Sequence, residues 1–181
     1  SDESDHIYIA YQDRDSTKLK IATDKSGSWD SYLVDTGTSP SSMYPGYMTS
    51  MAMDQQGQFH IDHQDSKDAD LRYSTGAPNN GWTHTVVDSS GSTGRDPSIA
   101  IDAAGQPHIV YHTWSGQNLK YATIDSATSN WIVTTMASGA EVGEGNSIFI
   151  DESGVMHVPF SDATSGVLKY ATKSTGLSQT N

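Results

Sequence analysis

The side chains best suited to binding chemistry lie around one tryptophan. Trp114 follows Tyr111 and His112 closely, and no other unit of the repeat described below has an aromatic residue at that place. A flat ring beside hydrogen-bonding groups is what stacking against a sugar ring requires. These residues predict a shallow carbohydrate platform, and the alternative is a surface tryptophan that only covers an edge of the fold.

Other aromatic and polar side chains in variable segments are candidates for the same surface. Tyr44 and Tyr47 flank a Pro-Gly turn and predict either a second platform or a packed pair. The remaining candidate ligand-binding residues are polar or charged, namely His63, Asp65, Arg14 and Arg95.

Three histidines recur at matching places, each preceded by an aspartate at a fixed spacing. The pairs are Asp54 and His60, Asp102 and His108, and Asp151 and His157. Three imidazoles would share a metal ion only if strands of different units converged, so a hydrogen bond repeated in each unit is the simpler interpretation. Each aspartate is expected to accept hydrogen bonds from backbone amides of a turn in which a glycine supplies positive φ.

An acidic run offers another chance of a metal site. Asp62, Asp65, Asp68 and Asp70 supply the hard oxygen ligands that Ca²⁺ prefers. Their spacing departs from the Asp-x-Asp-x-Asp-Gly pattern of calcium loops, so a solvated turn is favoured. Apart from this calcium alternative, no cofactor is predicted.

These residues belong to an internal repeat with a period of 48 to 49 residues, measured between Asp54, Asp102 and Asp151. Each unit contains four short runs of alternating apolar and polar residues, separated by turns rich in Gly, Ser and Asp. In one unit the expected strands are 98–101, 108–112, 119–123 and 131–136. Tandem four-stranded units of this length are typical of β-propeller blades. An all-β propeller is therefore predicted, with a stacked β-solenoid as the alternative.

The chain holds about 3.5 such blades in a single propeller segment, residues 1–181. The units run approximately over 1–46, 47–95, 96–144 and 145–181, with three, four, four and three strands. Because an incomplete blade exposes backbone groups, three interpretations arise. The chain is part of a longer propeller, or copies complete one ring, or it closes alone with four blades. The first two are favoured.

Tryptophan precedes the fourth strand in three units, at Trp29, Trp82 and Trp131. We expect these rings to wedge between blades rather than to stack on sugars. Apolar residues make up only 34% of the chain. The core is therefore expected to be thin and spread over the interfaces between blades.

Charge and composition exclude several classes of partner. The net charge of −12 argues against nucleic acid and against an anionic membrane surface. The absence of cysteine excludes disulfides and thiolate metal sites. Few charged residues and abundant Ser and Thr favour a secreted or cell-surface protein, although the first residues lack the features of a signal peptide.

The motifs Asp-x-x-Gly-x-x-His-Ile-x-Tyr at 102–111 and Leu-Lys-Tyr-Ala-Thr at 119–123 resemble the repeats of bacterial sialidase-like propellers, the BNR or Asp-box related family. The resemblance covers the whole chain and implies the architecture. Its members include sialidases, other glycosidases, polysaccharide lyases, lectins and adhesins, so it implies no single activity. Sialidases place three arginines around a carboxylate, whereas this chain has only Arg14, Arg72 and Arg95. Arg72 lies at a repeated basic position, where a structural role is expected. Catalysis by this chain alone is not expected.

The variable turns of the blades lie on one face of the predicted disc, where specificity is normally placed. The leading prediction is a non-catalytic carbohydrate-binding or adhesion propeller with a glycan partner, acting as a homo-oligomer or as a fragment of a longer propeller. The alternative is part of a glycoside hydrolase or polysaccharide lyase completed by further blades, with His63, His112 or Tyr111 as acid or base. A structural, protein-binding propeller is the third.

Overall fold

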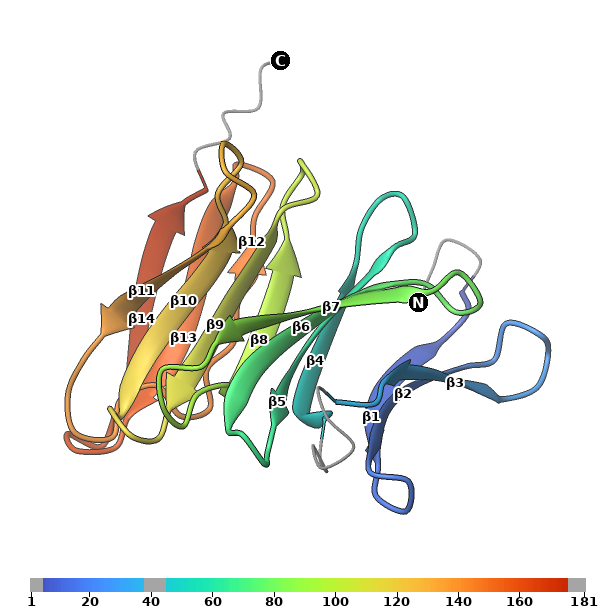
Figure 1. Cartoon of the computed structure of the whole chain (residues 1–181). Helices are drawn as coiled ribbons and strands as arrows, with labels where there is room; N and C mark the ends of the chain where they lie inside the picture. Colours follow the sequence, from blue (N-terminus) through green and yellow to red (C-terminus); the bar gives the residue numbers. More distant parts are fainter. Residues whose placement is uncertain (1–4, 38–44, 176–181) are drawn as a thin grey trace.

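The computed structural model describes residues 5–37 and 45–175, and Figure 1 shows them as four sheets placed side by side in an arc. These described residues form fourteen strands. Within them no helix is long and apolar enough to cross a membrane. In every sheet, each strand pairs antiparallel with the next strand in the chain. The blade-like, all-β architecture expected from the repeat is confirmed.

The strands number three, four, four and three in the successive sheets, as the repeat predicts. The first sheet contains β1 (Tyr8–Asp13), β2 (Lys18–Thr23) and β3 (Asp30–Asp35). The second contains β4 (Tyr47–Met53), β5 (Phe59–Asp65), β6 (Asp70–Gly76) and β7 (Trp82–Asp88). The third contains β8 (Arg95–Ile101), β9 (Pro107–Thr113), β10 (Asn118–Ile124) and β11 (Trp131–Ala137). The fourth contains β12 (Phe149–Ile150), β13 (Val155–Asp162) and β14 (Val167–Ser174).

The core lies between successive sheets and not inside any one of them. Leu19 and Ile21 of the first sheet form one buried cluster with Phe59 and Ile61 of the second. Equivalent clusters join the second sheet to the third and the third to the fourth. Because each sheet has two faces to cover and few apolar residues, the sheets depend on one another for burial. The thin core expected from composition is confirmed.

The first strands of neighbouring sheets lie beside one another and are linked by serine. The Ile99 amide donates to the Ser50 hydroxyl at 3.2 Å, and the Ile148 amide donates to the Ser98 hydroxyl at the same distance. These bonds join β4 to β8, and β8 to the start of the fourth sheet. One such bond is found at each of these two interfaces, and the described strands of neighbouring sheets share no backbone ladder there.

The three tryptophans before the fourth strands behave in two ways. Trp82 and Trp131 each pack against the cluster shared with the preceding sheet, and the Trp131 ring meets Tyr73 edge-on at 5.0 Å. These two rings wedge between blades as predicted. For Trp29 the prediction was wrong, because this ring is 56% exposed on the first sheet.

Each of the three later sheets contains the same chain of hydrogen bonds. In the third sheet, Asp102 Oδ1 accepts from the amides of Ala104 and Gln106, both at 2.9 Å, and Oδ2 lies 3.1 Å from His108 Nε2. His108 Nδ1 lies 2.6 Å from the Tyr121 hydroxyl. This geometry fits a neutral imidazole that donates to aspartate and accepts from tyrosine.

The same chain joins Asp54, His60 and Tyr73 in the second sheet, and Asp151, His157 and Tyr170 in the fourth. The aspartates also accept the amides of the turns that contain them, whose glycines have positive φ. The structural interpretation of the repeated histidines is therefore confirmed.

The burial of the histidine should decide how much these Asp-His-Tyr hydrogen bonds stabilise the fold. The side chain of His108 is 5% exposed and that of His157 is 29% exposed. We expect His108→Ala to lower the free energy of unfolding by about 1–3 kcal/mol for each buried group left unpaired, here Asp102 Oδ2 and the Tyr121 hydroxyl. His157→Ala should cost less, because water can reach its partners. Urea unfolding of both variants measures the difference, and equal losses would contradict it.

Candidate functional site

Three of the predicted residues meet at one corner of the third sheet. Arg95 at the start of β8 is the cross-strand partner of His112 near the end of β9. Trp114 follows β9 and is 55% exposed, and the Arg95 guanidinium lies over its ring, 4.4 Å from the centroid. A guanidinium over an aromatic face is an attractive contact that holds both groups in place. The corner thus presents a fixed aromatic ring and a fixed cation.

Local backbone geometry fixes this corner. Gly94 has φ of +72°, and a Cβ there would lie 2.9 Å from the Leu71 Cα of the preceding sheet, so only glycine fits. The register with β9 then shifts between Arg95 and Ser98, and Asp96 takes a left-handed φ of 43°. Such bulges re-aim side chains next to functional sites. The Trp114 amide donates to the Ser92 carbonyl at 2.9 Å, which ties the two loops together.

His112 is buried without a hydrogen-bond partner. Its ring is 1% exposed, and neither ring nitrogen is bonded within the described residues. Burial lowers the pKa of His112, and Arg95 lowers it further, whereas Glu144 and Asp96 act in the opposite direction. Buried polar groups are nearly always paired, so the two unbonded ring nitrogens of His112 are an exception within the described structure.

Residues at the start of the fourth sheet complete the corner. The Asn146 side-chain amide donates to the Asp96 and Gly143 carbonyls, both at 2.9 Å, while its Oδ1 is buried and unbonded in the described structure. Asp96 Oδ2 also lies 3.5 Å from the Gly145 amide. We call the set formed by Arg95, Asp96, His112, Trp114, Glu144 and Asn146 the Trp114 site.

Sequence reasoning missed Asp96, Glu144 and Asn146 as site residues. The sequence did contain a signal for Glu144. It occupies the same repeat position as Arg95, one period of 49 residues later. Residues at one position of consecutive blades lie at the same height on the disc.

Tyr111 lies on the other side of β9 from His112. It is fully buried, and its hydroxyl donates to Asp88 of the second sheet at 2.6 Å. Lys120 donates to the same carboxylate oxygen at 2.8 Å. Burial raises the pKa of Asp88, but the bonds from Lys120, Ser90 and Tyr111 hold it at about 2. Tyr111 therefore fastens the third sheet to the second and does not reach the rim.

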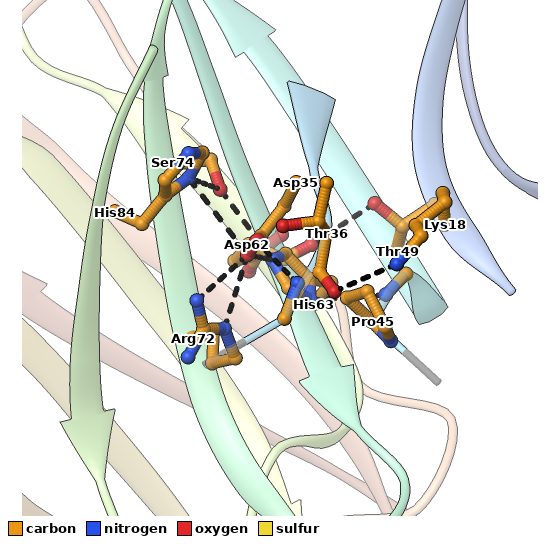
Figure 2. A network of polar contacts seen from close by, with 12 residues as sticks. Lys18, Asp35, Thr36, Pro45, Thr49, Asp62, His63, Arg72, Ser74 and His84 are labelled. Atoms are coloured by element: carbon orange, nitrogen blue, oxygen red, sulfur yellow. Dashed lines mark hydrogen bonds and ion pairs between the residues drawn. The ribbon is translucent and has the colours of Figure 1, made fainter. Parts of the chain in front are cut away.

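His63 occupies the equivalent place one sheet earlier, in the buried network that Figure 2 shows. Arg72 donates from Nε and Nη2 to Asp35 Oδ2 at 3.1 and 2.8 Å, consistent with the structural role expected for Arg72. His63 accepts from the Gly46 amide at Nδ1, 3.0 Å away, and places Nε2 3.4 Å from the same Asp35 oxygen. Both ring nitrogens of His63 are engaged inside the protein, so it is not placed to act on a ligand at the rim.

The acidic run does not converge on a metal. Asp62 and Asp65 are buried, so the solvated turn expected for these two was wrong. Burial raises the pKa of Asp62 well above its ordinary value, and neither of its carboxyl oxygens has a partner among the described residues. In residues 5–37 and 45–175, no three acidic or histidine side chains are grouped as a metal site.

The other candidates are dispersed along the same rim. Arg14 is exposed in the turn between β1 and β2, and Tyr47 is partly exposed at the start of β4 opposite Gln64. Asp65 accepts the Lys67 amide at 3.2 Å within its own turn. Tyr44 lies outside the described residues. Within the described ranges, no hydrogen bond, ion pair or ring contact joins Arg14, Tyr47 or Asp65 to the Trp114 site.

A cavity of about 650 Å³ lies elsewhere, between the first and second sheets, on the face that carries the Asp54 turn. Tyr8 and Phe59 in its wall pack on each other with ring centroids 4.7 Å apart. The carboxylate oxygens of Asp54 are hydrogen-bonded to amides of its own turn and to His60. The carboxylate of Asp54 is therefore already bonded within the protein, whereas the side chains of Lys25, Gln55 and Asn79 also line this cavity.

Comparison with known proteins identifies the fold. No family model matches the sequence, and no curated protein matches it either. An exo-β-1,3-galactanase from Phanerochaete chrysosporium, solved with β-1,3-galactotriose, is similar in structure with a TM-score of 0.58 and 16% identity, over 94% of this chain and 45% of that one.

Two further structures agree. The exo-β-1,3-galactanase from Clostridium thermocellum gives a TM-score of 0.59 at 12% identity, over 93% of this chain and 42% of that one. The intramolecular trans-sialidase from Ruminococcus gnavus gives a TM-score of 0.58 at 11% identity, over 97% of this chain and 42% of that one. This chain thus spans less than half the length of each. The similarity confirms a β-propeller fold, and the neighbours include a trans-sialidase.

Burial of His112 predicts a pH dependence of stability. The folded pKa lies below the ordinary value of 6.5, so near and below that pH the unfolded chain binds more protons than the folded one. Stability contributed by neutral His112 is therefore present above this range and lost as the pH falls. His112→Gln, which copies Gln64 of the second sheet, should lose less stability between about pH 7 and about pH 5. Urea unfolding at each pH tests this, and identical pH curves would contradict it.

Proposed function

We propose that this chain is a carbohydrate-binding β-propeller and that glycans bind at the Trp114 site. The observation that carries the proposal is an exposed, fixed tryptophan ring beside buried polar groups that lack partners. The apolar face of a sugar ring stacks on an aromatic ring, while its hydroxyls require donors and acceptors at the edge.

The polar groups of the site suit that task. Arg95 supplies donors, and the carboxylates of Asp96 and Glu144 supply acceptors. His112 can donate from one nitrogen and accept at the other, as its neutral form allows. Both ring nitrogens are buried, so a sugar hydroxyl reaches either of them only if the side chains that cover the imidazole move apart.

The fold neighbours support a carbohydrate partner by their names alone. Two are exo-β-1,3-galactanases, one of them holding a galactotriose, and another is a trans-sialidase. At their low identity they supply the scaffold, and the site argument comes from the residues of this chain.

A glycoside hydrolase is the second candidate function. Asp96 and Glu144 come from neighbouring sheets, and both act on the pKa of His112. Most glycoside hydrolases use two carboxylic acid side chains for catalysis. Under this alternative the fold would use the same corner for cleavage, completed by further blades.

Glycan binding is tested by changing the ring. β-1,3-Galactotriose and a panel of neutral and acidic oligosaccharides are titrated calorimetrically into the purified chain. Trp114→Ala should weaken binding of the preferred sugar at least about tenfold, the equivalent of about 1.4 kcal/mol, because the stacking surface is removed. Trp114→Phe, which keeps a ring, should retain most of the affinity.

Arg14→Ala is the matched control, since Arg14 lies at the equivalent turn of the first sheet and should leave the affinity unchanged. Unaltered binding by Trp114→Ala would show that the site is wrongly placed. Release of new reducing ends from the same sugars, abolished by Glu144→Gln, would favour the hydrolase instead.

A further inference from the structure

The outward face of the fourth sheet carries apolar side chains that are exposed in the described structure. Leu168 is 77% exposed and Tyr170 is 61% exposed. At the same repeat positions, Leu71 and Tyr73 of the second sheet are buried, as are Leu119 and Tyr121 of the third, because the next sheet packs on them. Phe149 is exposed on β12 as well. We call Phe149, Leu168 and Tyr170 the tail face.

The opposite end of the arc exposes the complementary half of the same interface. Ile7 and Ile9 are each 47% exposed in the first sheet. The residues at the position of Ile9 in later sheets, Ile61, Ile109 and Val158, are fully buried against the sheet before them. With the exposed Trp29, these residues form the head face.

We propose that the tail face of one copy of this chain binds the head face of another. The interfaces inside the chain show the contacts to expect, because Trp131 packs edge-on against Tyr73 and Ile109 shares a cluster with Leu71. Trp29 therefore meets Tyr170, and Ile9 meets Leu168, across the joint. This inference does not depend on carbohydrate binding.

The repeat is what identifies a second copy as the occupant. One chain carries both halves of an interface that it already forms three times internally, so another copy supplies a matching surface at each end. Burying the two faces removes from water apolar groups that are costly to leave exposed. Since the two faces differ, the contact is heterologous, and it yields a ring if the rotation closes or an open assembly if it does not.

Light scattering over a wide range of protein concentration tests the proposal. The unmodified chain should form dimers or larger assemblies, whereas Leu168→Asp and Ile9→Asp should each have the mass of one chain. Val86→Asp is the matched control, because Val86 is exposed on an outer strand and lies on neither face. Phe149→Asp provides a second change on the tail face. A single-chain mass for the unmodified protein at every concentration overturns the proposal.

Mixing the two variants fixes the direction of the contact. Leu168→Asp keeps its head face and Ile9→Asp keeps its tail face, so an equimolar mixture should form a 1:1 complex that cannot grow. Self-association of either variant alone would mean that like faces bind each other, which also overturns the head-to-tail proposal. Far-ultraviolet circular dichroism of each variant confirms that the sheets are retained.

Discussion

The packing of one sheet on the next is the interaction on which the whole structure depends. Leu71 and Tyr73 on β6 gain their burial only from the third sheet, and the third sheet gains part of its own from them. Because apolar residues are few, the sheets have no other apolar layer that could bury these side chains. Polar contacts follow the same geometry, since the bonds of Asp35 to Arg72 and of Asp88 to Lys120 also cross from sheet to sheet.

The Trp114 site lies where the repeat changes its residues. At the position of Trp114 the other turns carry Arg14, Ser66 and Ala163, and at the position of His112 the second sheet carries Gln64. Gln64 is satisfied, because its side chain donates to the Thr93 carbonyl, whereas the imidazole of His112 has no such bond. A scaffold fixed by repeated contacts can leave individual polar groups unpaired where a ligand is to bind.

The period of the sequence predicted the strands, the aspartate turns and the histidine bonds, because each is a local pattern repeated with little change. The placement of individual site residues was harder to predict from the sequence, and strand geometry explains why. Neighbouring residues of a strand point to opposite faces, so Tyr111 shares with Ile109 the side that packs on the second sheet, while His112 is buried on the opposite side. His63 belongs to a buried polar network with Asp35 and Arg72. Asp35 is distant from His63 in sequence, so no local pattern indicated this network. Burial of Asp62 had no sequence signal, since an aspartate in an acidic run is normally solvated.

The serine bonds between inner strands bear on the geometry of the ring. Ser50 and Ser98 each accept one amide of the next sheet, and Asn146 adds a bond to Asp96 of β8. With few polar bonds between inner strands, the volume of the side chains packed beside them contributes to the angle between sheets. Ala52 and Ala100 occupy one position of β4 and β8, where β12 carries Phe149. A small residue there lets the neighbouring sheet approach closely, and a large one splays it outward. Side-chain volume at this single position therefore contributes to the angle between neighbouring sheets.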